Sequence, residues 1–402
     1  MGETGKIIIS GAGIAGLAAA LAFAARGFSV EVLERAEAFA EVGAGLQLSP
    51  NATHLLDQLG LLPQLRTVAV APEAVILRTA TTLAKLAHVP LGEFAQQRWG
   101  APYLVAHRAD LQNILVKAAH AVDAISITTG VEVVCAKPST TGVSVSSRGA
   151  AKPHDQNCHL VIGADGVWST LRSQVAPNAE ARFGGKLAWR TLVPAESPGG
   201  RTLATLNADN NVTAFLHPHA HLIVYPVRGG AAFNLVALSS GNSQAREWGG
   251  ESDIANLLKA LEKADPKLIQ LVREAPRWTV WPVHSVNPRA TWTRDGRIAL
   301  IGDAAHAMTP YAAQGAAMAI EDAVTLSYAA STPGGSMAEA LQRWELDRRH
   351  RIMRVARRGA LNRTAWHASG PVGVVRDIFL KIQSPERLAG NLDWLYGWVP
   401  AA

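Results

Sequence analysis

Runs of apolar residues in the first part of the chain predict a strand, a helix and a second strand. Lys6 to Ser10 is a short run of β-branched residues, typical of a buried parallel strand. A glycine-rich turn follows, and Ile14 to Arg26 is expected to be a helix that Gly27 ends. Ser29 to Leu33 predicts the second strand, with Glu34 at its end. This order and length are those of a complete strand–helix–strand unit.

Strand-like runs dominate the middle of the chain, roughly from Phe183 to Val283, where Gly-Gly and Pro separate them. This pattern predicts a mostly antiparallel sheet, and so a second domain of different architecture. Further strands are expected within Thr128 to Ser147, at Leu160 to Gly163 and at Arg297 to Ile301. Helices are expected at Ile254 to Glu274, from about Gln314 to Ala330 and from Ala338 to Leu361.

The motif GAGIAG lies where the first strand turns into the first helix. Gly11 permits a tight turn, Gly13 lets the backbone approach a diphosphate, and Gly16 lets the helix pack on the strand. The helix N-terminus then offers unpaired N–H groups and a positive dipole. Glu34 is placed to accept hydrogen bonds from a ribose diol. The alternative is a chance glycine pattern in a tight turn, and the motif alone does not separate FAD from NAD.

A second motif, IALIGDAAHAMTPYAAQGAAMAIEDA, reads as strand, turn and helix and favours a flavin. Asp303 follows the strand and suits the ribityl hydroxyls of a flavin. Gln314 and Gly315 begin a helix whose N-terminus, beside an isoalloxazine ring, would stabilise the anion of reduced flavin. NAD needs no such second site far down the chain. We therefore expect non-covalently bound FAD.

A third motif, VIGADGVWSTLR, contains a strand that ends in Asp165 and Gly166. A helix is expected to begin near Ser169. The alternative is an ordinary turn with a helix cap, because Asp, Gly and Ser are common in both.

Together these patterns predict an α/β protein with a Rossmann-like FAD-binding domain, an inserted, mostly antiparallel β-sheet substrate domain and C-terminal helices. We assign residues 1–70, 103–178 and 286–332 to the FAD-binding domain. Residues 71–102 and 179–285 form the substrate-binding domain, and residues 333–402 the C-terminal helical region.

Composition narrows the class of protein. Of the 402 residues, 48% are hydrophobic and 17% charged, which fits a globular chain. The formal charge of +6 is concentrated near Arg343 to Arg363, without the interleaved aromatics of a nucleic-acid site. The two cysteines lack metal-type spacing, and we find no signal peptide or membrane span. We expect a cytoplasmic monomer or homodimer that binds neither nucleic acid nor, stably, membranes.

The three motifs resemble those of the class A flavoprotein monooxygenases, the single-component flavin-dependent aromatic hydroxylases. Closer similarity is to the salicylate hydroxylase and 6-hydroxynicotinate 3-monooxygenase branch. It is carried by EVGAGLQLSPNA at 41–52, HRADLQNIL at 107–115, HLIVYPVRGG at 221–230, PYAAQGAAMAIEDA at 310–323, and LDWLYGW near the C-terminus. Many members of the wider family have Gly-Gln-Gly where this chain has Ala313-Gln314-Gly315, and the branch tolerates the alanine.

The resemblance implies a set of cofactor-binding residues. In this family the Asp-Gly segment helps hold both FAD and the pyridine nucleotide. Because the chain has a single GxGxxG motif, NADH or NADPH would bind transiently in a groove and not in a Rossmann domain of its own. For Arg108, the alternative interpretation is a surface arginine next to Asp110 with no role in cofactor binding. The cofactor-binding residues are Gly11, Gly13, Ala15, Gly16, Glu34, Arg35, Arg108, Asp165, Asp303, Gln314, Gly315 and Ala316.

On the substrate side, His221 and Tyr225 match a His-x-x-x-Tyr pair that lines the pocket of the branch. We expect them to be catalytic; the alternative is a hydrogen-bonded sheet histidine and a core tyrosine. Arg190 after Trp189 is expected to bind a carboxylate while Trp189 stacks on the substrate, against the alternatives of a solvated arginine and a packed sheet residue. The remaining pocket candidates are Gln47, Pro310 and Tyr311. No metal is expected, although His217, His219 and His221 cluster.

The activity that this resemblance implies is hydroxylation of a small hydroxyaromatic or hydroxypyridine acid with NAD(P)H and molecular oxygen, through a flavin hydroperoxide. That oxidant needs an electron-rich ring carbon, and hence a base for the substrate hydroxyl. Two alternatives remain open at this stage. One is an FAD-dependent reductase or dehydrogenase without ring hydroxylation, and the other is a non-catalytic flavin-binding sensor.

Overall fold

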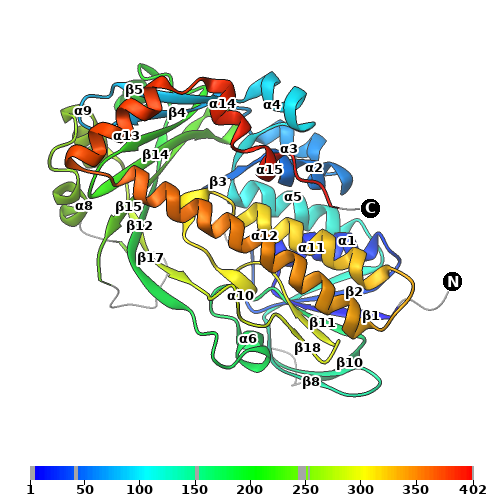
Figure 1. Ribbon diagram of the computed structural model, residues 1–402. Coiled ribbons are helices and arrows are strands. Elements are labelled where there is room, and N and C mark those ends of the chain that lie inside the picture. The colour runs from blue at the N-terminus through cyan, green and yellow to red at the C-terminus, as the bar shows by residue number, and fades with distance from the viewer. Residues whose placement is uncertain (1–4, 40–43, 150–153, 243–249, 252–253, 401–402) are drawn as a thin grey trace.

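Two sheets and a long helical layer form the body of the protein, as the computed structural model in Figure 1 shows. The structure describes residues 5–39, 44–149, 154–242, 250–251 and 254–400. Residues 41–43, the start of the segment EVGAGLQLSPNA, lie outside the described residues.

A six-stranded sheet carries the nucleotide-binding half. Its order is β18-β19-β11-β1-β2-β7, parallel throughout except for the β18–β19 pair. The strands are β1 (Lys6–Ser10), β2 (Ser29–Glu34), β7 (Ile125–Thr129), β11 (Leu160–Gly163), β18 (Thr293–Arg294) and β19 (Ile298–Leu300). Ile7, Ile8 and Ile9 of β1 are fully buried, because a central parallel strand is covered on both faces.

An eight-stranded sheet forms the second half, in the order β16-β17-β12-β15-β14-β13-β4-β5. All its neighbouring pairs are antiparallel except β13 with β4. The strands are β4 (Ala74–Thr79), β5 (Lys85–Pro90), β12 (Arg182–Pro194), β13 (Asn211–Leu216), β14 (Ala220–Val227), β15 (Ala232–Ser240), β16 (Gly250–Glu251) and β17 (Thr279–Ser285).

Two smaller sheets complete the strands. β8 (Val131–Pro138), β9 (Val143–Gly149) and β10 (His154–Cys158) form an antiparallel sheet. β3 (Gly45–Leu48) pairs with β6 (Leu104–His107). This last pair places Gln47 beside the large sheet, since Gly45 donates its N–H to Oδ1 of Asn234 on β15 at 2.6 Å.

Helices cover both sheets. The helices before the second nucleotide motif are α1 (Ile14–Ala24), α2 (Pro50–Gln58), α3 (Leu62–Val68), α4 (Gly92–Trp99), α5 (Arg108–His120), α6 (Thr170–Val175), α7 (Pro198–Ala204), α8 (Ala255–Ala260) and α9 (Pro266–Glu274). Those that follow are α10 (Asp303–His306), α11 (Gly315–Ser331), α12 (Met337–Trp366), α13 (Gly370–Ile382), α14 (Pro385–Gly390) and α15 (Asp393–Tyr396). Short 3₁₀ turns occur at η1 (Arg228–Gly230) and η2 (Pro310–Ala312).

The long helix α12 crosses the molecule and connects its two halves. It packs along α11, and its later turns lie against η2, in front of the large sheet in Figure 1. Its start is fixed by a capping box, in which Ser336 accepts from the N–H of Glu339 and the Glu339 carboxylate accepts from the N–H of Ser336. The helix therefore sets the position of the second nucleotide motif relative to the substrate sheet.

The predicted fold class is confirmed, with one helix divided differently. The stretch Ile254 to Glu274 contains two helices rather than one, because Asp265 caps α9 and Pro266 occupies its first position. The helix α12 extends beyond the predicted Ala338 to Leu361 at both ends. The division of the chain into domains stays a prediction. None of the helices in the described part of the chain has the length and apolar character needed to cross a bilayer.

Candidate active site

The glycine-rich loop between β1 and α1 has three glycines in three different surroundings. Gly11 has a φ of +102°, and a Cβ there would lie 2.5 Å from the carbonyl oxygen of Ala164. A Cβ at Gly16 would collide with the carbonyl oxygen of Gly11, whereas a Cβ at Gly13 would meet nothing within 4 Å. Gly11 and Gly16 thus allow a tight fold, and Gly13 leaves the backbone open to a ligand.

Two side chains hold this loop from opposite sides. Glu34 at the end of β2 accepts from the N–H of Ala12 at 2.7 Å and from that of Ala36 at 2.9 Å, through different oxygens. Gln112 of α5 donates to the carbonyl oxygen of Ala12 at 3.0 Å. Each oxygen of Glu34 keeps acceptor capacity for a ribose hydroxyl. Sequence reasoning missed Gln112, although it lies in the segment HRADLQNIL.

A second helix N-terminus, that of α11, opens onto the same space. Neither α1 nor α11 has a side-chain hydrogen bond at its N-cap, so both keep free N–H groups. A Cβ at Gly315 would meet nothing within 4 Å. The turn before α11 requires Ala313 to adopt a φ of +51°, a left-handed conformation that favours glycine. Glycine at this position would adopt the same conformation without that strain.

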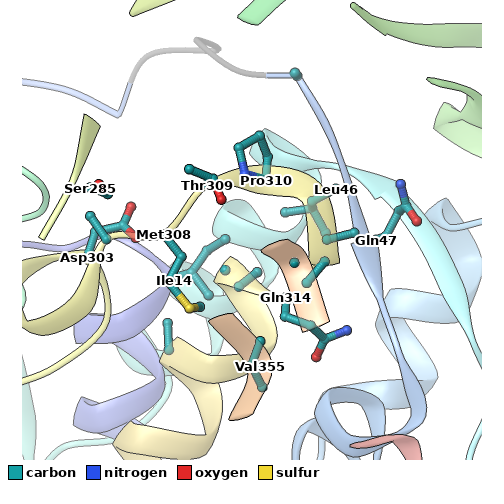
Figure 2. Close-up of a pocket in the computed structure, with 18 of the residues that line it drawn as sticks. Ile14, Leu46, Gln47, Ser285, Asp303, Met308, Thr309, Pro310, Gln314 and Val355 are labelled. Atoms are coloured by element: carbon teal, nitrogen blue, oxygen red, sulfur yellow. The ribbon is translucent and has the colours of Figure 1, made fainter. Parts of the chain in front are cut away.

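Between these two helix ends and the large sheet lies a cavity of about 670 Å³. That volume is in the range of small-molecule and cofactor sites. Figure 2 shows Ile14, Gln47, Asp303 and Pro310 around it, each from a different element. The predicted site residues that line it are Gly13, Ala15, Gln47, Arg108, Arg190, Tyr225, Asp303, Pro310, Gln314, Gly315 and Ala316.

The other predicted site residues lie outside this lining, and their surroundings differ. Gly11, Gly16 and Glu34 shape the loop from behind, and Arg35 is exposed. Oδ2 of Asp165 caps α6 by accepting from the N–H groups of Thr170 and Leu171 at 2.8 and 3.2 Å. Its Oδ1 is buried without a hydrogen-bond partner among the described residues. The cavity wall is formed instead by its neighbours Ala164 and Gly166.

Positive charge dominates the lining. Arg108, Arg182 and Arg190 contribute guanidinium groups, against the carboxylate of Asp303. Arg190 lies 5.4 Å from the ring centre of Trp281, and its Nε is buried without a partner among the described residues. Burial lowers the pKa of Arg190. An arginine in this setting is suited to a carboxylate that enters the cavity.

The expectation that Trp189 stacks on a substrate in the cavity is wrong. Alternate residues of a strand face opposite sides of the sheet, so Trp189 faces away from the side of Arg190. Trp189 packs in the separate core on the other face, and its Nε1 donates to Oγ of Ser239 at 2.9 Å. This is the packed sheet residue of the alternative interpretation.

Tyr225 and Gln47 meet at the wall formed by β14 and β3. Tyr225 is 3% exposed, and burial raises the pKa of its hydroxyl, so the phenol stays protonated. A Cβ at Gly45 would lie 2.5 Å from the Tyr225 ring, so only glycine permits this packing. Gln47 also accepts a hydrogen bond from the hydroxyl of Tyr103 at 2.6 Å. The segment GAGLQL thus shapes the cavity through Gly45 as well as Gln47.

His221 lies on the same strand as Tyr225 but behind the cavity wall. It is 0% exposed, and its ring contacts those of Tyr311, Trp366 and His367. Its partner across β15 is Leu238, which lines the cavity. Burial holds the pKa of His221 well below its usual range, so the imidazole is neutral. Trp366 and His367, more than 140 positions along the chain, were not found from sequence.

A buried polar cluster supports α11 from the side away from the cavity. Gln314 points into it, donating to Oγ of Ser49 at 2.9 Å and accepting from Nδ2 of Asn51 at 3.3 Å. Asn51 also donates to Glu321 at 2.7 Å. Glu321 pairs with Arg348 at 2.6 Å and with Arg351 at 2.5 Å. Only the backbone at Gln314 is therefore left to face a ligand.

The carboxylate next to Glu321 fixes the turn that carries Asp303. Asp322 accepts from the N–H of Gly302 at 2.9 Å and pairs with His306 at 2.5 Å and Arg348 at 2.8 Å. Despite its burial, these partners lower the pKa of Asp322. Within the described residues, no group of three or more His, Cys, Asp or Glu side chains is arranged to hold a metal.

These residues fit FAD. Two uncapped helix N-termini, an open glycine at each and a carboxylate at the end of β2 face or adjoin one cavity. The first end suits a diphosphate and the second a flavin ring, while Asp303 and the arginines supply acceptors and charge.

Comparisons with known proteins agree with this fit. A family model described as an FAD binding domain matches residues 4–359. The 3-hydroxybenzoate 6-hydroxylase of Polaromonas naphthalenivorans is 35% identical over 402 residues, covering 98% of this chain and 96% of that protein. The 6-hydroxynicotinate 3-monooxygenase of Bordetella bronchiseptica is 31% identical over 356 residues, covering 88% and 90%.

Solved structures share the fold. A salicylate hydroxylase in a substrate complex superposes with a TM-score of 0.83 at 23% identity, covering 99% of this chain and 97% of that one. The chain belongs to the FAD-binding domain family. Within it, the protein is an FAD-dependent monooxygenase of the class A flavoprotein hydroxylases, with NAD(P)H and molecular oxygen as co-substrates.

Proposed function

We propose that the cavity hydroxylates a small aromatic or pyridine ring that carries both a carboxylate and a hydroxyl group. The observation that carries this proposal is Arg190, a cavity-lining arginine whose buried Nε lacks a partner among the described residues. Leaving such a donor unsatisfied is costly, and a substrate carboxylate would satisfy it. The relatives support the same class: their names specify hydroxybenzoate, hydroxynicotinate and amino-hydroxybenzoate.

When bound, FAD supplies the redox chemistry that takes electrons from NAD(P)H and activates oxygen. We assign its diphosphate to the N-terminus of α1 and its ribose to Glu34. Asp303 would accept from the ribityl hydroxyls, Arg108 would contact the phosphate or ribose, and the N-terminus of α11 would face the flavin ring. The roles of Arg35 and Asp165 stay predictions, because neither side chain lines the cavity.

His221 and Tyr225 are proposed to act on the substrate hydroxyl. A neutral imidazole can accept its proton, and the protonated Tyr225 can donate a hydrogen bond to the oxygen that remains. His221 Nε2 is buried with no partner among the described residues, which supports this role. Its strand partner Leu238 lines the cavity, so His221 lies one side chain behind the wall, and the proposed proton route passes this wall directly or through one water molecule.

The test of this proposal compares the consumption of NAD(P)H with product formed. 3-Hydroxybenzoate, 6-hydroxynicotinate and benzoate are offered to the wild-type protein and to Arg190→Met. We expect the two hydroxy acids to stimulate NAD(P)H oxidation, and Arg190→Met to raise KM by roughly 10- to 100-fold, because a charge-assisted hydrogen bond contributes about 1.5–3 kcal/mol. Equal KM values in both proteins would remove Arg190 from carboxylate binding. Oxidation of NAD(P)H that no ring compound stimulates would instead indicate the plain reductase.

We propose that the protein is a monomer or a homodimer. We also propose that it is located in the cytoplasm. One face of α13 supports the homodimer, because a second copy of this chain could cover its exposed apolar side chains. These include Val374, Val375, Ile378, Phe379 and Ile382, each more than half exposed. Light scattering of the wild type and Ile378→Glu distinguishes the two states. A mass of one chain in both proteins would exclude the homodimer.

A further inference from the structure

Behind the cavity wall, two histidines and a tyrosine converge on one nitrogen. Nε2 of His367 lies 3.2 Å from Nδ1 of His221 and 3.4 Å from the hydroxyl of Tyr311. His367 is the C-cap of α12, and its other nitrogen, Nδ1, lies 3.2 Å from the carbonyl oxygen of Pro218. We infer that His367 relays protons between the buried His221 and the protein surface. This inference rests on the proposed role of His221 as the base.

The hydrogen bonds determine which ring nitrogens carry protons. A carbonyl oxygen only accepts, so Nδ1 of His367 must be the protonated nitrogen that donates to Pro218. In a neutral ring, Nε2 of His367 is then an acceptor. We assign the donor role to Nδ1 of His221, which lies nearer to this nitrogen than the Tyr311 hydroxyl does, and this leaves Nε2 of His221 with a free lone pair. That nitrogen is the one buried without a partner among the described residues.

The far side of His367 faces an open depression of the surface. This depression is separate from the cavity and is lined by Lys186, Pro218, Arg363 and His367, among others. His221 is 0% exposed and His367 only partly buried, so the pair spans the distance from the interior to water. A base at His221 without such an outlet would have to keep each proton that it accepts.

The relay balances in both directions. On activation, the substrate O–H bond breaks and Nε2 of His221 gains that proton, while Nδ1 of His221 passes its own proton to Nε2 of His367. Nδ1 of His367 then gives up the proton that it shares with the carbonyl oxygen of Pro218, and water takes it in the depression that both residues line. When the product hydroxyl is reprotonated, each transfer runs in reverse, which restores both starting tautomers. No oxidant or other reactant is required beyond water.

The charges around His367 favour release of the proton. Lys186 of β12 and Arg363 of α12 lie at the outlet, and His217 before β14 and His221 on it are the other titratable neighbours on the sheet side. Burial, Lys186 and Arg363 lower the pKa of His367, while the backbone carbonyls of Pro218 and His217 raise it. This net lowering of the pKa favours the neutral ring of His367 after a proton has passed.

The tautomers can be read without substrate. Two-bond nitrogen–proton NMR spectra of the ¹⁵N-histidine-labelled holoenzyme distinguish a ring protonated at Nδ1 from one protonated at Nε2, and His221→Gln and His367→Gln assign the signals. We expect both rings to be neutral and protonated at Nδ1 at pH 7.5. A His221 ring protonated at Nε2 would overturn the relay, whatever the substrate of the enzyme is.

The second measurement follows ionisation of bound 3-hydroxybenzoate by its ultraviolet absorption after a pH jump, without oxygen or NAD(P)H. His367→Gln keeps hydrogen-bonding groups but cannot pass a proton. We expect ionisation to slow by roughly 10- to 100-fold, which is part of the ~100- to 10,000-fold rate effect of a general base. Imidazole in the buffer should restore the wild-type rate. His219→Gln, an exposed neighbouring histidine, is the matched control and should keep the wild-type rate.

Wild-type ionisation rates in His367→Gln would overturn the relay. A slow rate that imidazole does not restore would also overturn it, because it would indicate a structural defect, which a lowered melting temperature would accompany. If 3-hydroxybenzoate does not bind to the wild type, the proposed substrate class fails for this acid. The relay is then decided by the tautomers alone.

Discussion

At the scale of single residues, the strained turn before α11 offers a direct test of backbone geometry. Ala313 has a φ of +51°, which costs an L-residue about 1–2 kcal/mol. We expect Ala313→Gly to stabilise the protein by about 0–1 kcal/mol, since the greater entropy of glycine in the unfolded chain offsets part of the relief. Urea denaturation of both proteins measures this change in the free energy of unfolding. A loss above 1 kcal/mol would mean that the alanine methyl group packs favourably.

Histidine burial predicts how stability depends on pH. Burial and the neighbouring histidines His219 and His367 lower the pKa of His217 from 6.5 to about 4. The unfolded chain therefore binds more protons between these values, so the stability that the neutral His217 contributes is present above pH 6.5 and is lost as the pH falls towards 4. Melting temperatures of His217→Asn should fall less steeply over this window than those of the wild type. The exposed His120→Asn, remote from His217 in sequence, is the control, and equal slopes in all three proteins would contradict the assignment.

Residue patterns predicted the tight glycine-rich turn after the first strand but not the side chains that surround His221, for a physical reason. Gly11, Gly13 and Gly16 act within one turn, where spacing along the chain is also spacing in the fold. Strand alternation correctly places His221 on the same face as Tyr225. Strand alternation does not show that His367, 146 positions further along the chain, covers that face. Contacts between distant segments depend on how elements pack, which local periodicity does not encode.

At the scale of elements, α11 and α12 are joined by buried charge. Glu321 of α11 receives hydrogen bonds from Asn51, Arg348 and Arg351, and Arg351 also donates to the carbonyl oxygens of Trp394 and Leu395. The sequence motif that ends in AIEDA predicted only a helix here. The partners of its two acids lie on elements whose packing the sequence does not reveal.

This cluster predicts a large effect of a small substitution. Glu321→Gln leaves Arg351 without its carboxylate and Arg348 with that of Asp322 alone, and should destabilise the protein by about 3–5 kcal/mol. Asp347→Asn, an exposed acid on α12, should change stability by less than about 0.5 kcal/mol. Guanidinium chloride denaturation of both variants compares them. A loss below 1 kcal/mol in Glu321→Gln would show that the cluster does not hold the two helices.

The turn that carries Asp303 is predicted to matter for the cofactor more than for the fold. Asp303 is exposed in the cavity lining, whereas Asp322 behind it anchors the turn. We expect Asp303→Ala to weaken FAD binding by roughly 1–3 kcal/mol, through loss of the acceptors for the ribityl hydroxyls, with little change in the stability of the apoprotein. Fluorescence titration of apoprotein with FAD measures this. Wild-type affinity would remove Asp303 from the flavin site.

At the scale of the whole molecule, the two sheets divide the work. The parallel sheet presents two helix N-termini to one side of the cavity, and the antiparallel sheet supplies Arg190, Tyr225 and the wall before His221. A change of apolar spacing along the chain was enough to predict both sheets. It was not enough to predict how the small β3–β6 pair joins the two halves through Gly45 and Asn234.

The central claim is that this protein inserts an oxygen atom from molecular oxygen into a hydroxylated aromatic acid. The measurement is mass spectrometry of the product formed from 3-hydroxybenzoate or 6-hydroxynicotinate under ¹⁸O₂ in ordinary water, alongside NAD(P)H consumption. We expect a hydroxylated product with one ¹⁸O atom, formed in near-equal amount to the NAD(P)H consumed. Product oxygen that comes from water, or NAD(P)H oxidation that yields hydrogen peroxide and no hydroxylated product from either acid, would contradict the account.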